Sequence, residues 1–344
     1  MMRTSIIGAT GYAGADLLRL LLNHNEITLS VLTSESYAGQ PISQVYPHLK
    51  GHVDIVLDNM NIDLIIDKSD VVFVALPHGH AMKVVPALLT AGKKVIDFGA
   101  DYRLRDTAVF EQWYKHTHVS PDLKAVYGLP ELNREQIIGA KVVANPGCYT
   151  TASILAIAPL LREGLVDPHS VIVDAKSGIS GAGRGLGLGS HYPEATENVK
   201  AYNIGGHRHT PEIEQELSVA AGEPITISFT PHLMPMTRGI LATCYMNLKP
   251  EVTMDQITTA FNKAYQHEFF VRLLGPGQYP ATKNVRGTNH CDLGWHVDPR
   301  TNRVIVVSAI DNLVKGAAGQ ALQNMNIICG FPETMGLRFP ALYP

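Results

Sequence analysis

The chain has 344 residues, of which 45% are hydrophobic and 17% are charged, and this is the size and composition of a two-domain globular protein with a large core. The formal net charge of -3, without a long run of Lys and Arg, excludes the basic surface typical of nucleic-acid-binding proteins. No apolar stretch reaches the roughly 18 residues of a membrane helix, so we expect neither a nucleic-acid nor a membrane partner.

The N-terminal third alternates short apolar runs with helical patterns. The sequence predicts strands over 4–7, 27–32, 71–76, 94–98 and 141–145, and helices over 11–22 and 80–91. This β-α-β order predicts a Rossmann-type domain with a parallel sheet. The first strand begins without a signal-peptide pattern, and the four cysteines (148, 244, 291 and 329) are too widely spaced for a disulfide framework or a metal site. We therefore expect a cytoplasmic protein with four thiols.

The rest of the chain has longer strand patterns. Segments 171–183, 224–235 and 238–248 predict antiparallel strands, and helices are expected near 150–162, 211–220 and 254–266. A strand over 303–312 leads into a small-residue helix over 313–326. We expect a second, α+β domain with a mainly antiparallel sheet.

A glycine-rich turn follows the first strand, where Gly8, Gly11 and Gly14 have the spacing GxxGxxG. Glycines at a strand–helix turn let the backbone approach a pyrophosphate, and the helix start offers N–H groups to it. Thr10 adds a hydroxyl donor. The turn predicts a dinucleotide site, although a β–α turn without a ligand is the alternative.

The end of the second strand distinguishes NAD from NADP. The hydroxyls of Ser34 and Ser36 suit a 2′-phosphate, whereas Glu35 would hold a ribose hydroxyl and would repel a phosphate unless it points away. This segment favours NADP.

Cys148 stands in the stretch NPGCYTT, between a predicted strand and a predicted helix. A helix start stabilises a thiolate, and its N–H groups can receive an oxyanion. Pro146 and Gly147 predict a sharp turn that keeps bulk away from the sulfur. We interpret Cys148 as a nucleophile, with a buried structural cysteine as the alternative.

A thiolate of this kind needs an acid/base partner, and the best candidates lie in GGHRHTPEI. Thr210 can cap the helix that starts at Pro211, with His209 just before it and Glu212 placed to orient the imidazole. His207 is the alternative acid/base. His-x-His is also a metal-ligand pattern, but no third ligand accompanies it, so we predict no metal.

Basic residues beside glycines suggest an acidic substrate or a phosphate leaving group. They are Arg103, Lys176, Arg184 and Arg238.

The motifs GATGYAGADLLRLL, DFGADYRL, VYGLPELNR, NPGCY, KSGISGAGR, GGHRHTPEIEQEL, PMTRGI and DNLVKGAAGQALQNMN cover nearly the whole chain. In these motifs the sequence resembles the N-acetyl-gamma-glutamyl-phosphate reductases of arginine biosynthesis, which are relatives of aspartate-semialdehyde dehydrogenase. Thr150 departs from the family motif, and we expect it not to contact the sulfur.

The resemblance implies an NADPH-dependent reduction of N-acetyl-L-glutamyl 5-phosphate to the 5-semialdehyde, with release of phosphate, through a thioester on Cys148. It implies a homodimer or homotetramer. It also implies that 1–147 with 312–344 form the dinucleotide-binding domain and 148–311 the catalytic, substrate and oligomerisation domain. The residues expected to bind the cofactor are Gly8, Thr10, Gly11, Tyr12, Gly14, Ser34, Ser36, Pro77, Gly181 and Asn312. Those expected to bind the acyl-phosphate substrate are Arg103, Asn145, Lys176, Ser177, Arg184 and Arg238.

Three alternatives stay open. A related lysine-pathway enzyme acts on a longer aminoadipyl phosphate carried on an acidic protein, and a basic docking face would favour it. Aspartate-semialdehyde dehydrogenase fits NPGCY and HRHTPEI less well. A non-catalytic nucleotide sensor would lack a nucleophile or a base, and this sequence has candidates for both.

Overall fold

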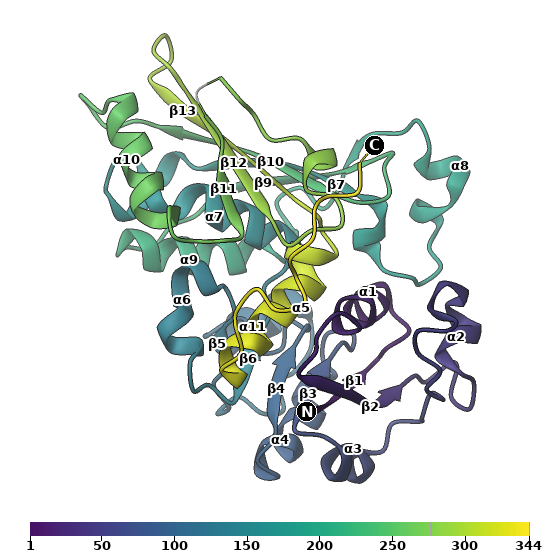
Figure 1. Cartoon of the computed structure of the whole chain (residues 1–344). Coiled ribbons are helices and arrows are strands. Elements are labelled where there is room, and N and C mark those ends of the chain that lie inside the picture. The colour runs from purple at the N-terminus through teal and green to yellow at the C-terminus, as the bar shows by residue number, and fades with distance from the viewer. Residues whose placement is uncertain (276, 344) are drawn as a thin grey trace. The chain divides into compact units, whose positions relative to one another are not determined.

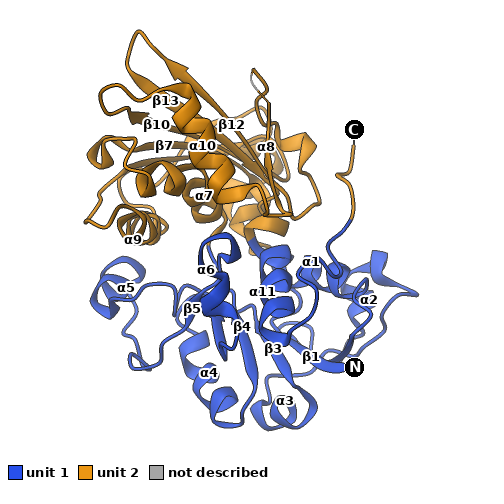
Figure 2. Ribbon diagram, turned by 60° about the vertical axis from the view of Figure 1, so that its left-hand side comes forward, with its two compact units in different colours: residues 1–146, 317–338 blue, residues 147–316, 339–344 orange. Residues whose placement is uncertain are grey.

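The computed structural model describes residues 1–275 and 277–343, and the chain divides into two compact units (Figure 2). Unit 1 comprises Met1–Pro146 and Ala317–Arg338, and unit 2 comprises Gly147–Gly316 and Phe339–Pro344. These limits differ from the expected domain limits at the end of the chain, because residues 312–316 and 339–344 group with unit 2. The functional division into a cofactor and a catalytic domain stays a prediction.

Unit 1 is built on a sheet of six parallel strands in the order β2-β1-β3-β4-β6-β5 (Figure 1). Its middle strands are apolar and fully buried, as expected for a parallel sheet that is covered on both faces. The strands are β1 (Met2–Ile7), β2 (Ile27–Thr33), β3 (Val71–Val74), β4 (Lys94–Asp97), β5 (Val126–Tyr127) and β6 (Val142–Ala144). The predicted Rossmann-type architecture is confirmed.

Helices from both ends of the chain pack on this sheet. The helix α1 contacts α11, which also contacts β4, while α3 contacts α4 in the main apolar cluster of the unit. The helices of unit 1 are α1 (Tyr12–Leu21), α2 (Ile42–Val45), α3 (Ile62–Lys68), α4 (Ala81–Thr90), α5 (Thr107–Tyr114), α6 (Pro130–Ile137) and α11 (Gly319–Cys329), with the 3-10 turn η1 (Pro47–Leu49).

The last helix is tied to unit 1 by buried amides. The side chain of Asn324 donates to the carbonyl of Gly128 at 2.8 Å and to Oδ1 of Asn145 at 3.1 Å. Gln323 donates to Glu333 at 2.6 Å. Because these amides are buried, their hydrogen bonds fix the place of α11 on the sheet.

Unit 2 contains a mixed sheet of seven strands in the order β11-β12-β13-β10-β7-β9-β8. Four neighbouring pairs of described strands are antiparallel and two are parallel, so the predicted, mainly antiparallel second domain is confirmed. The strands are β7 (Ile172–Gly178), β8 (Lys200–Ala201), β9 (Ser228–Met234), β10 (Ile240–Asn247), β11 (Val271–Leu273), β12 (Cys291–Asp298) and β13 (Arg303–Ile310).

Some predicted details of this sheet were wrong. The strand β7 pairs with β9 in parallel, and it ends at Gly178, where a 3-10 turn replaces the expected continuation to 183. A Cβ on Gly178 would lie 2.6 Å from the carbonyl of Thr237, so this close approach ends the strand. The strand β12 was not predicted, because Asp292 and Gly294 interrupt its apolar pattern.

The helices α7, α9 and α10 lie on one side of the unit 2 sheet, whereas α8 lies beyond its end (Figure 1). The helix α7 contacts β10 and β13 and is almost wholly buried, and α9 and α10 contact α7. The helices are α7 (Cys148–Arg162), α8 (Tyr192–Ala195), α9 (Thr210–Ala221) and α10 (Met254–Tyr265), with 3-10 turns η2 (Pro168–Ser170), η3 (Ile179–Ala182), η4 (Leu188–Ser190) and η5 (Thr282–Asn284).

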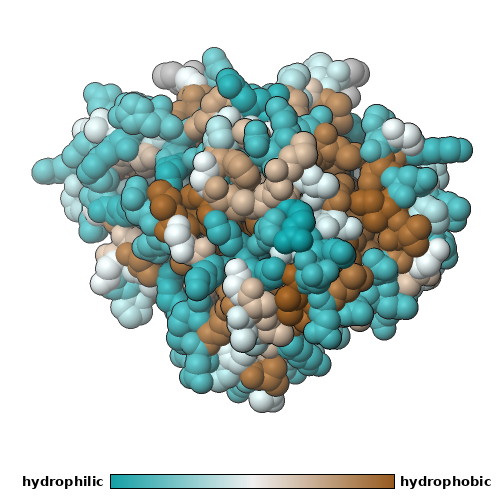
Figure 3. Space-filling view, turned by 60° about the horizontal axis from the view of Figure 1, so that its bottom comes forward, coloured by the Kyte–Doolittle hydropathy of each residue, from teal (hydrophilic) through white to brown (hydrophobic). Residues whose placement is uncertain are grey.

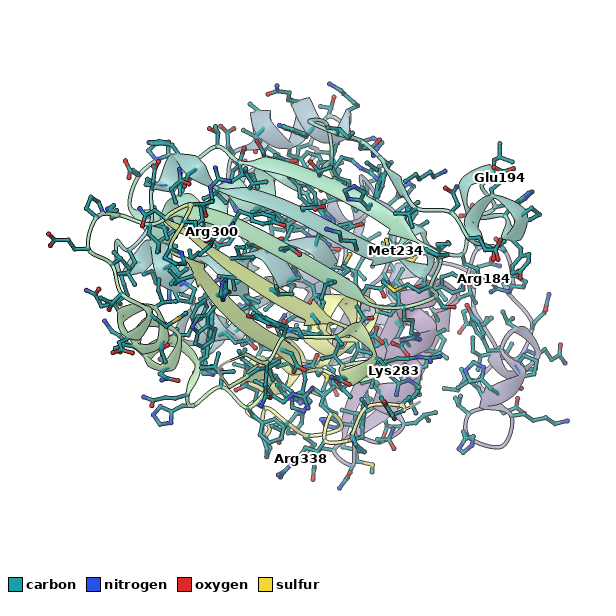
Figure 4. All side chains as sticks on the ribbon, turned by 90° about the horizontal axis from the view of Figure 1, so that it is seen from above. Arg184, Glu194, Met234, Lys283, Arg300 and Arg338 are labelled. Atoms are coloured by element: carbon teal, nitrogen blue, oxygen red, sulfur yellow. The ribbon has the colours of Figure 1, made fainter. Side chains whose placement is uncertain are left out.

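The side of the sheet away from α7 is partly exposed, and Figure 4 looks onto it. On β10 the residues alternate strictly between buried positions and half-buried ones, as in a sheet with one covered face. The half-buried positions of β10 and β13 include Leu241, Thr243, Tyr245, Ile305 and Val307.

The helix that we expected over 313–326 does not begin as a regular α-helix. Residues Val314–Ala318 form a π-helical turn, η6, and the α-helix α11 starts only at Gly319. The buried carboxylate of Asp311 causes this start, because it accepts the N–H groups of Leu313 at 2.8 Å and Val314 at 3.1 Å.

None of the described helices combines the length and the apolar character that crossing a membrane requires. On the face shown in Figure 3, polar and apolar residues are interspersed.

Candidate active site

Cys148 is the first residue of α7, and Gly147 is the N-cap. This confirms the predicted local structure of a helix start at the cysteine. The thiol is half-buried, and the described cysteines form no disulfide. Since a helix start directs its first N–H groups outward and favours negative charge, the local structure suits a thiolate.

Glu212 holds the turn in front of Cys148. It is buried in the first turn of α9, and its Oε1 accepts the N–H of Gly147 and the hydroxyl of Thr150, each at 2.9 Å. These contacts give Glu212 a place at the start of α7, and its expected role in orienting an imidazole stays a prediction. Thr150, which we expected not to contact the sulfur, shares this carboxylate.

The two candidate histidines lie beside the same turn. The ring of Tyr149, next to Cys148, meets the ring of His207 at a centroid distance of 5.5 Å and that of His209 at 6.0 Å. The two imidazoles are themselves 4.8 Å apart. His209 is the N-cap of α9, so Thr210 is the first helical residue and not the cap that we expected.

The environments of the two imidazoles differ. Nδ1 of His207 accepts the N–H of His209 at 3.0 Å. Burial, with a smaller effect of Arg208, lowers the pKa of His207 to about 4. His207 is therefore neutral near pH 7 and takes part in the local backbone structure, which leaves His209 as the better acid/base candidate.

Two tyrosine hydroxyls form a hydrogen-bonded chain next to Cys148. Tyr202 donates to the hydroxyl of Tyr149 at 3.1 Å, and Tyr149 donates to the carbonyl of His232 at 3.3 Å. Burial raises the pKa of Tyr202 to about 12, and the charge on Cys148 acts in the same direction. Sequence reasoning missed Tyr202, because it follows a two-residue strand far from Cys148 in the chain.

Lys176 and Ser177 were both expected to bind substrate, but neighbouring residues of a strand point to opposite faces. Ser177 is buried, and its hydroxyl interacts with Tyr149, so it is on the α7 side. Lys176 is half-buried on the other face, where Nζ lies 2.6 Å from Oδ2 of Asp174. The structure brings Ser177 to the Cys148 region and does not bring Lys176 there.

The two arginines of unit 2 that we expected to bind substrate lie in loops. Arg238 lies between β9 and β10, and its Nη1 is 3.4 Å from the buried carboxylate of Asp311. Arg184 is half-buried in the glycine-rich segment after η3, and Figure 4 shows it beyond the end of the sheet.

Asn312 lies in unit 2 and is bonded within it. Its amide donates to the hydroxyl of Ser180 at 3.0 Å and accepts the N–H of Gly239 at 2.7 Å. A Cβ on Gly181 would lie 3.7 Å from this amide. The structure therefore brings together Asn312 and Gly181, the two cofactor candidates in this unit.

Each of the three glycines in the turn after β1 is explained by a different structural feature. Gly8 has a φ of 85°, and a Cβ on Gly14 would lie 2.7 Å from the carbonyl of Gly8, so both are needed by the fold. A Cβ on Gly11 would have only that carbonyl nearby, at 3.8 Å. Since the fold does not exclude a side chain at Gly11, this open space at the start of α1 fits a pyrophosphate.

The serines expected to bind the 2′-phosphate differ in exposure. Ser34 is buried, and its hydroxyl lies 2.8 Å from that of Thr10, whereas Ser36 is exposed beside an exposed Glu35. Ser36 is accordingly the better placed of the two. The remaining candidates of this unit are exposed, with Tyr12 opening α1 and Pro77 following β3.

Arg103 is buried at the base of a cavity of unit 1. Its Nη2 donates to the carbonyl of Phe98 at 2.7 Å. The cavity has a volume of about 50 Å³, and Arg105, Lys124 and His118 also line it, together with one carboxylate, that of Asp101. Three basic groups and an imidazole at one cavity suit an anion.

Asn145, another substrate candidate, makes its contacts inside unit 1. Its amide donates to the carbonyl of Ala317 at 3.0 Å, and its carbonyl oxygen accepts from Asn324. These bonds give it a structural role at the end of β6.

Two family models match most of the chain, and relatives match its full length. The model described as "Semialdehyde dehydrogenase, NAD binding domain" matches residues 3–140, and "Semialdehyde dehydrogenase, dimerisation domain" matches residues 148–312. An N-acetyl-gamma-glutamyl-phosphate reductase from Symbiobacterium thermophilum is 58% identical over 98% of this chain and 97% of its own. That from Desulforudis audaxviator is 55% identical over the full length of both chains.

Solved structures support the fold. Aspartate semialdehyde dehydrogenase II from Vibrio cholerae aligns with a TM-score of 0.72, over 95% of this chain and 98% of its own, at 17% identity. At this identity the likeness concerns the fold alone.

Proposed function

The chain belongs to the N-acetyl-gamma-glutamyl-phosphate reductase family, as its motifs predicted, and we propose that it reduces N-acetyl-L-glutamyl 5-phosphate to N-acetyl-L-glutamate 5-semialdehyde and phosphate. The observation that carries this proposal is the position of Cys148 as the first residue of α7. Glu212 bonds to the turn before it, and two imidazoles lie beside the neighbouring Tyr149. An acyl phosphate is a suitable substrate for such a thiolate.

NADPH is the proposed cofactor, and the residues present fit it. Gly11 leaves open space at the start of α1, and the exposed Ser36 at the end of β2 offers a hydroxyl to a 2′-phosphate. When bound, NADPH supplies the hydride of the reduction.

The first chemical step is acyl transfer to sulfur. The Cys148 thiolate attacks the acyl carbon, the carbon–sulfur bond forms, and the bond to phosphate breaks. Arg103, at the base of the basic cavity of unit 1, stabilises the departing phosphate. Arg184 and Arg238, both in loops of unit 2, are the proposed partners of the carboxylate of the substrate, whereas Lys176 lies on the other face of the sheet.

The second step turns the thioester into the aldehyde. The oxyanion of the thiohemiacetal rests on N–H groups at the start of α7. His209 donates a proton to this oxygen and takes it back as the carbon–sulfur bond breaks, which regenerates the Cys148 thiolate. Glu212 and Thr150 keep the turn before the cysteine in place.

The alternative functions are not favoured. Relatives of more than half identity over the full length carry the name of the arginine-pathway enzyme. A non-catalytic sensor has no need of a thiol at a helix start whose neighbour, Tyr149, packs against two imidazoles.

We also propose that the enzyme is a homodimer or a homotetramer. The half-buried face of the unit 2 sheet, with Tyr245, Val307 and Ile305, supports this assembly, and the family model of this region is described as a dimerisation domain. A cytoplasmic location suits an enzyme whose nucleophile must stay reduced.

The test is the reverse reaction, followed by the absorbance of NADPH with N-acetyl-glutamate semialdehyde, phosphate and NADP. Turnover that needs phosphate, and that is lost with aspartate semialdehyde or with NAD, supports the proposed reaction, substrate and cofactor. Turnover with aspartate semialdehyde in place of the acetylated substrate would overturn the substrate, and absence of turnover with every pair would overturn the enzymatic function.

A further inference from the structure

The turn η6 lies against Cys148, from which it is separated by more than 160 residues of sequence. The N–H of Gly316 donates to the carbonyl of Asp311, five residues earlier, at 3.0 Å, which is the hydrogen-bond pattern of a π-helix. A π turn holds one more residue than an α-helical turn, so its backbone projects farther from the axis. Single π turns are rare and occur often at functional sites.

The fully buried Asp311 fixes the beginning of this turn. Its Oδ1 accepts the N–H groups of Leu313 and Val314, and its Oδ2 accepts the N–H of Gly287 at 2.7 Å. Arg238 lies 3.4 Å away on the same carboxylate. Four groups from three separate segments thus converge on this carboxylate and prevent the turn from shifting.

Lys315 fixes the middle of the turn. It has no exposed surface, although lysine is rarely buried, and its Nζ lies 5.7 Å from the centre of the Phe270 ring. A long side chain held inside the unit anchors the backbone on both sides of it.

Gly316 is the residue of the turn that meets the cysteine. A Cβ on Gly316 would lie 2.7 Å from Cβ of Cys148 and 3.2 Å from its Cα. Both of these atoms belong to a residue that cannot move without moving the start of α7. The bare backbone of Gly316 therefore fills one side of Cys148, and the sulfur cannot occupy that side.

We propose that the π turn Val314–Ala318 positions the Cys148 thiol, and that Gly316 is the positioning residue that makes the contact. The turn keeps the sulfur at the start of α7, where helix N–H groups stabilise the thiolate. This inference rests on the proposed role of Cys148 as the nucleophile, but the contact and the thiol reactivity can be measured without any substrate.

The first experiment tests the contact by a double-mutant cycle on thermal stability. We expect Gly316→Ala to lower the melting temperature by at least about 3 °C, because the new methyl group meets Cys148. In a Cys148→Gly background, which removes the contact at 2.7 Å and keeps only the milder one with Cα at 3.2 Å, the same substitution should lower it by at most about half as much. An equal loss of melting temperature in both backgrounds would overturn the proposal. So would failure to fold of both the single variant Gly316→Ala and the double variant Gly316→Ala with Cys148→Gly.

The second experiment tests positioning through the rate at which iodoacetamide alkylates Cys148 as a function of pH. Gly316→Ala should slow alkylation at neutral pH by at least about fivefold, because a displaced sulfur loses the N–H groups that favour its thiolate. The matched control is Gly294→Ala, whose Cβ would lie 2.6 Å from the carbonyl of Gln278 in the same unit. It should lower stability but leave the alkylation profile unchanged.

Unchanged alkylation in folded Gly316→Ala, or equal slowing in Gly294→Ala, would reduce Gly316 to a packing role and overturn the proposal. If Gly316→Ala folds only together with Cys148→Gly, the contact is supported directly. Because neither readout uses turnover, a failure of the proposed reaction would be seen separately in the assay with N-acetyl-glutamate semialdehyde.

Discussion

The carboxylate of Glu212 accepts the backbone N–H of Gly147 at 2.9 Å across 65 positions of sequence, so the first turn of α9 is bonded to the turn that precedes the α7 cysteine. A carboxamide of the same shape can accept this bond as well. Replacing Glu212 by Gln or by Ala therefore separates the effect of this bond on activity from the effect of the negative charge.

We expect Glu212→Gln to keep at least about a tenth of wild-type kcat/KM, because Oε1 still accepts from Gly147 and Thr150. Glu212→Ala should lose about 100-fold, since it leaves both donors without this acceptor and releases the turn before Cys148. Steady-state kinetics and thermal melting check both variants. A Gln variant as poor as the Ala variant would show that charge, rather than the bonded geometry, is what matters.

Replacing the nucleophile should abolish catalysis and leave cofactor binding intact. We expect Cys148→Ser to retain less than about a thousandth of the wild-type kcat while binding NADPH as before, measured by fluorescence titration. Cys329→Ser is the control and should stay active, because burial raises the pKa of that thiol to about 11. Substantial turnover by Cys148→Ser would refute the thioester mechanism.

The pH dependence of kcat/KM should distinguish the two histidines. Since the pKa of His207 is lowered to about 4, its titration lies below the usual assay range, and His207→Asn should leave any ionisation between about pH 5 and 8 in place. His209→Asn should remove that ionisation and lower activity by about 100-fold or more. The reverse pattern would assign the acid/base role to His207.

The glycine turn offers a test of cofactor binding that does not disturb the fold. Gly11→Ala should fold normally, because its Cβ meets only a carbonyl at 3.8 Å, but it should weaken NADPH binding by about tenfold or more. The control Gly14→Ala should lower the melting temperature, because its Cβ would lie 2.7 Å from the carbonyl of Gly8. Unchanged NADPH affinity in Gly11→Ala would contradict a cofactor at this turn.

A buried carboxyl should make stability fall with rising pH. Burial, followed by the charge of Asp101, raises the pKa of Asp97 to about 7, and its Oδ2 has no hydrogen-bond partner among the described residues. Between the ordinary value of about 4 and this raised value, the folded chain keeps a proton that the unfolded chain has lost. The free energy of unfolding therefore decreases across this window, by about 4 kcal/mol at most.

Asp97→Asn should reduce this decrease, because the amide stays neutral and can still accept the N–H of Gly99. Chemical denaturation at about pH 5 and pH 8 measures the effect. The control Asp298→Asn should leave the decrease in place, since Arg300 lowers the pKa of that carboxyl. An identical pH dependence in wild type and Asp97→Asn would contradict the prediction.

The sequence predicts those features whose causes are local. The apolar stripe of α7, together with Pro146 and Gly147, predicts a helix that starts at Cys148, and the alternation of strands and helices predicts the parallel sheet. Strand alternation could also have shown that Lys176 and Ser177 point to opposite faces.

Features that depend on distant partners were missed. The strand β12 contains Asp292, which Arg272 on the neighbouring strand pairs at 2.6 Å, so tertiary contact overrides its weak strand pattern. The small-residue run after Asp311 has the pattern of a plain helix, and only the convergence on that carboxylate makes its start a π turn. The contacts of Glu212 with Gly147 and Thr150 likewise join segments that the sequence keeps apart.

The place of α11 has a consequence for the order in which the protein is made. Unit 1 begins with the first strand of the chain, but the amide of Asn324, which binds Gly128 and Asn145, is synthesised about 180 residues after Asn145. All of Gly147–Gly316 is synthesised before α11 is available. We expect the Gly147–Gly316 part of unit 2 to fold first, while the sheet of unit 1 lacks α11 and depends on chaperones until this helix has been synthesised.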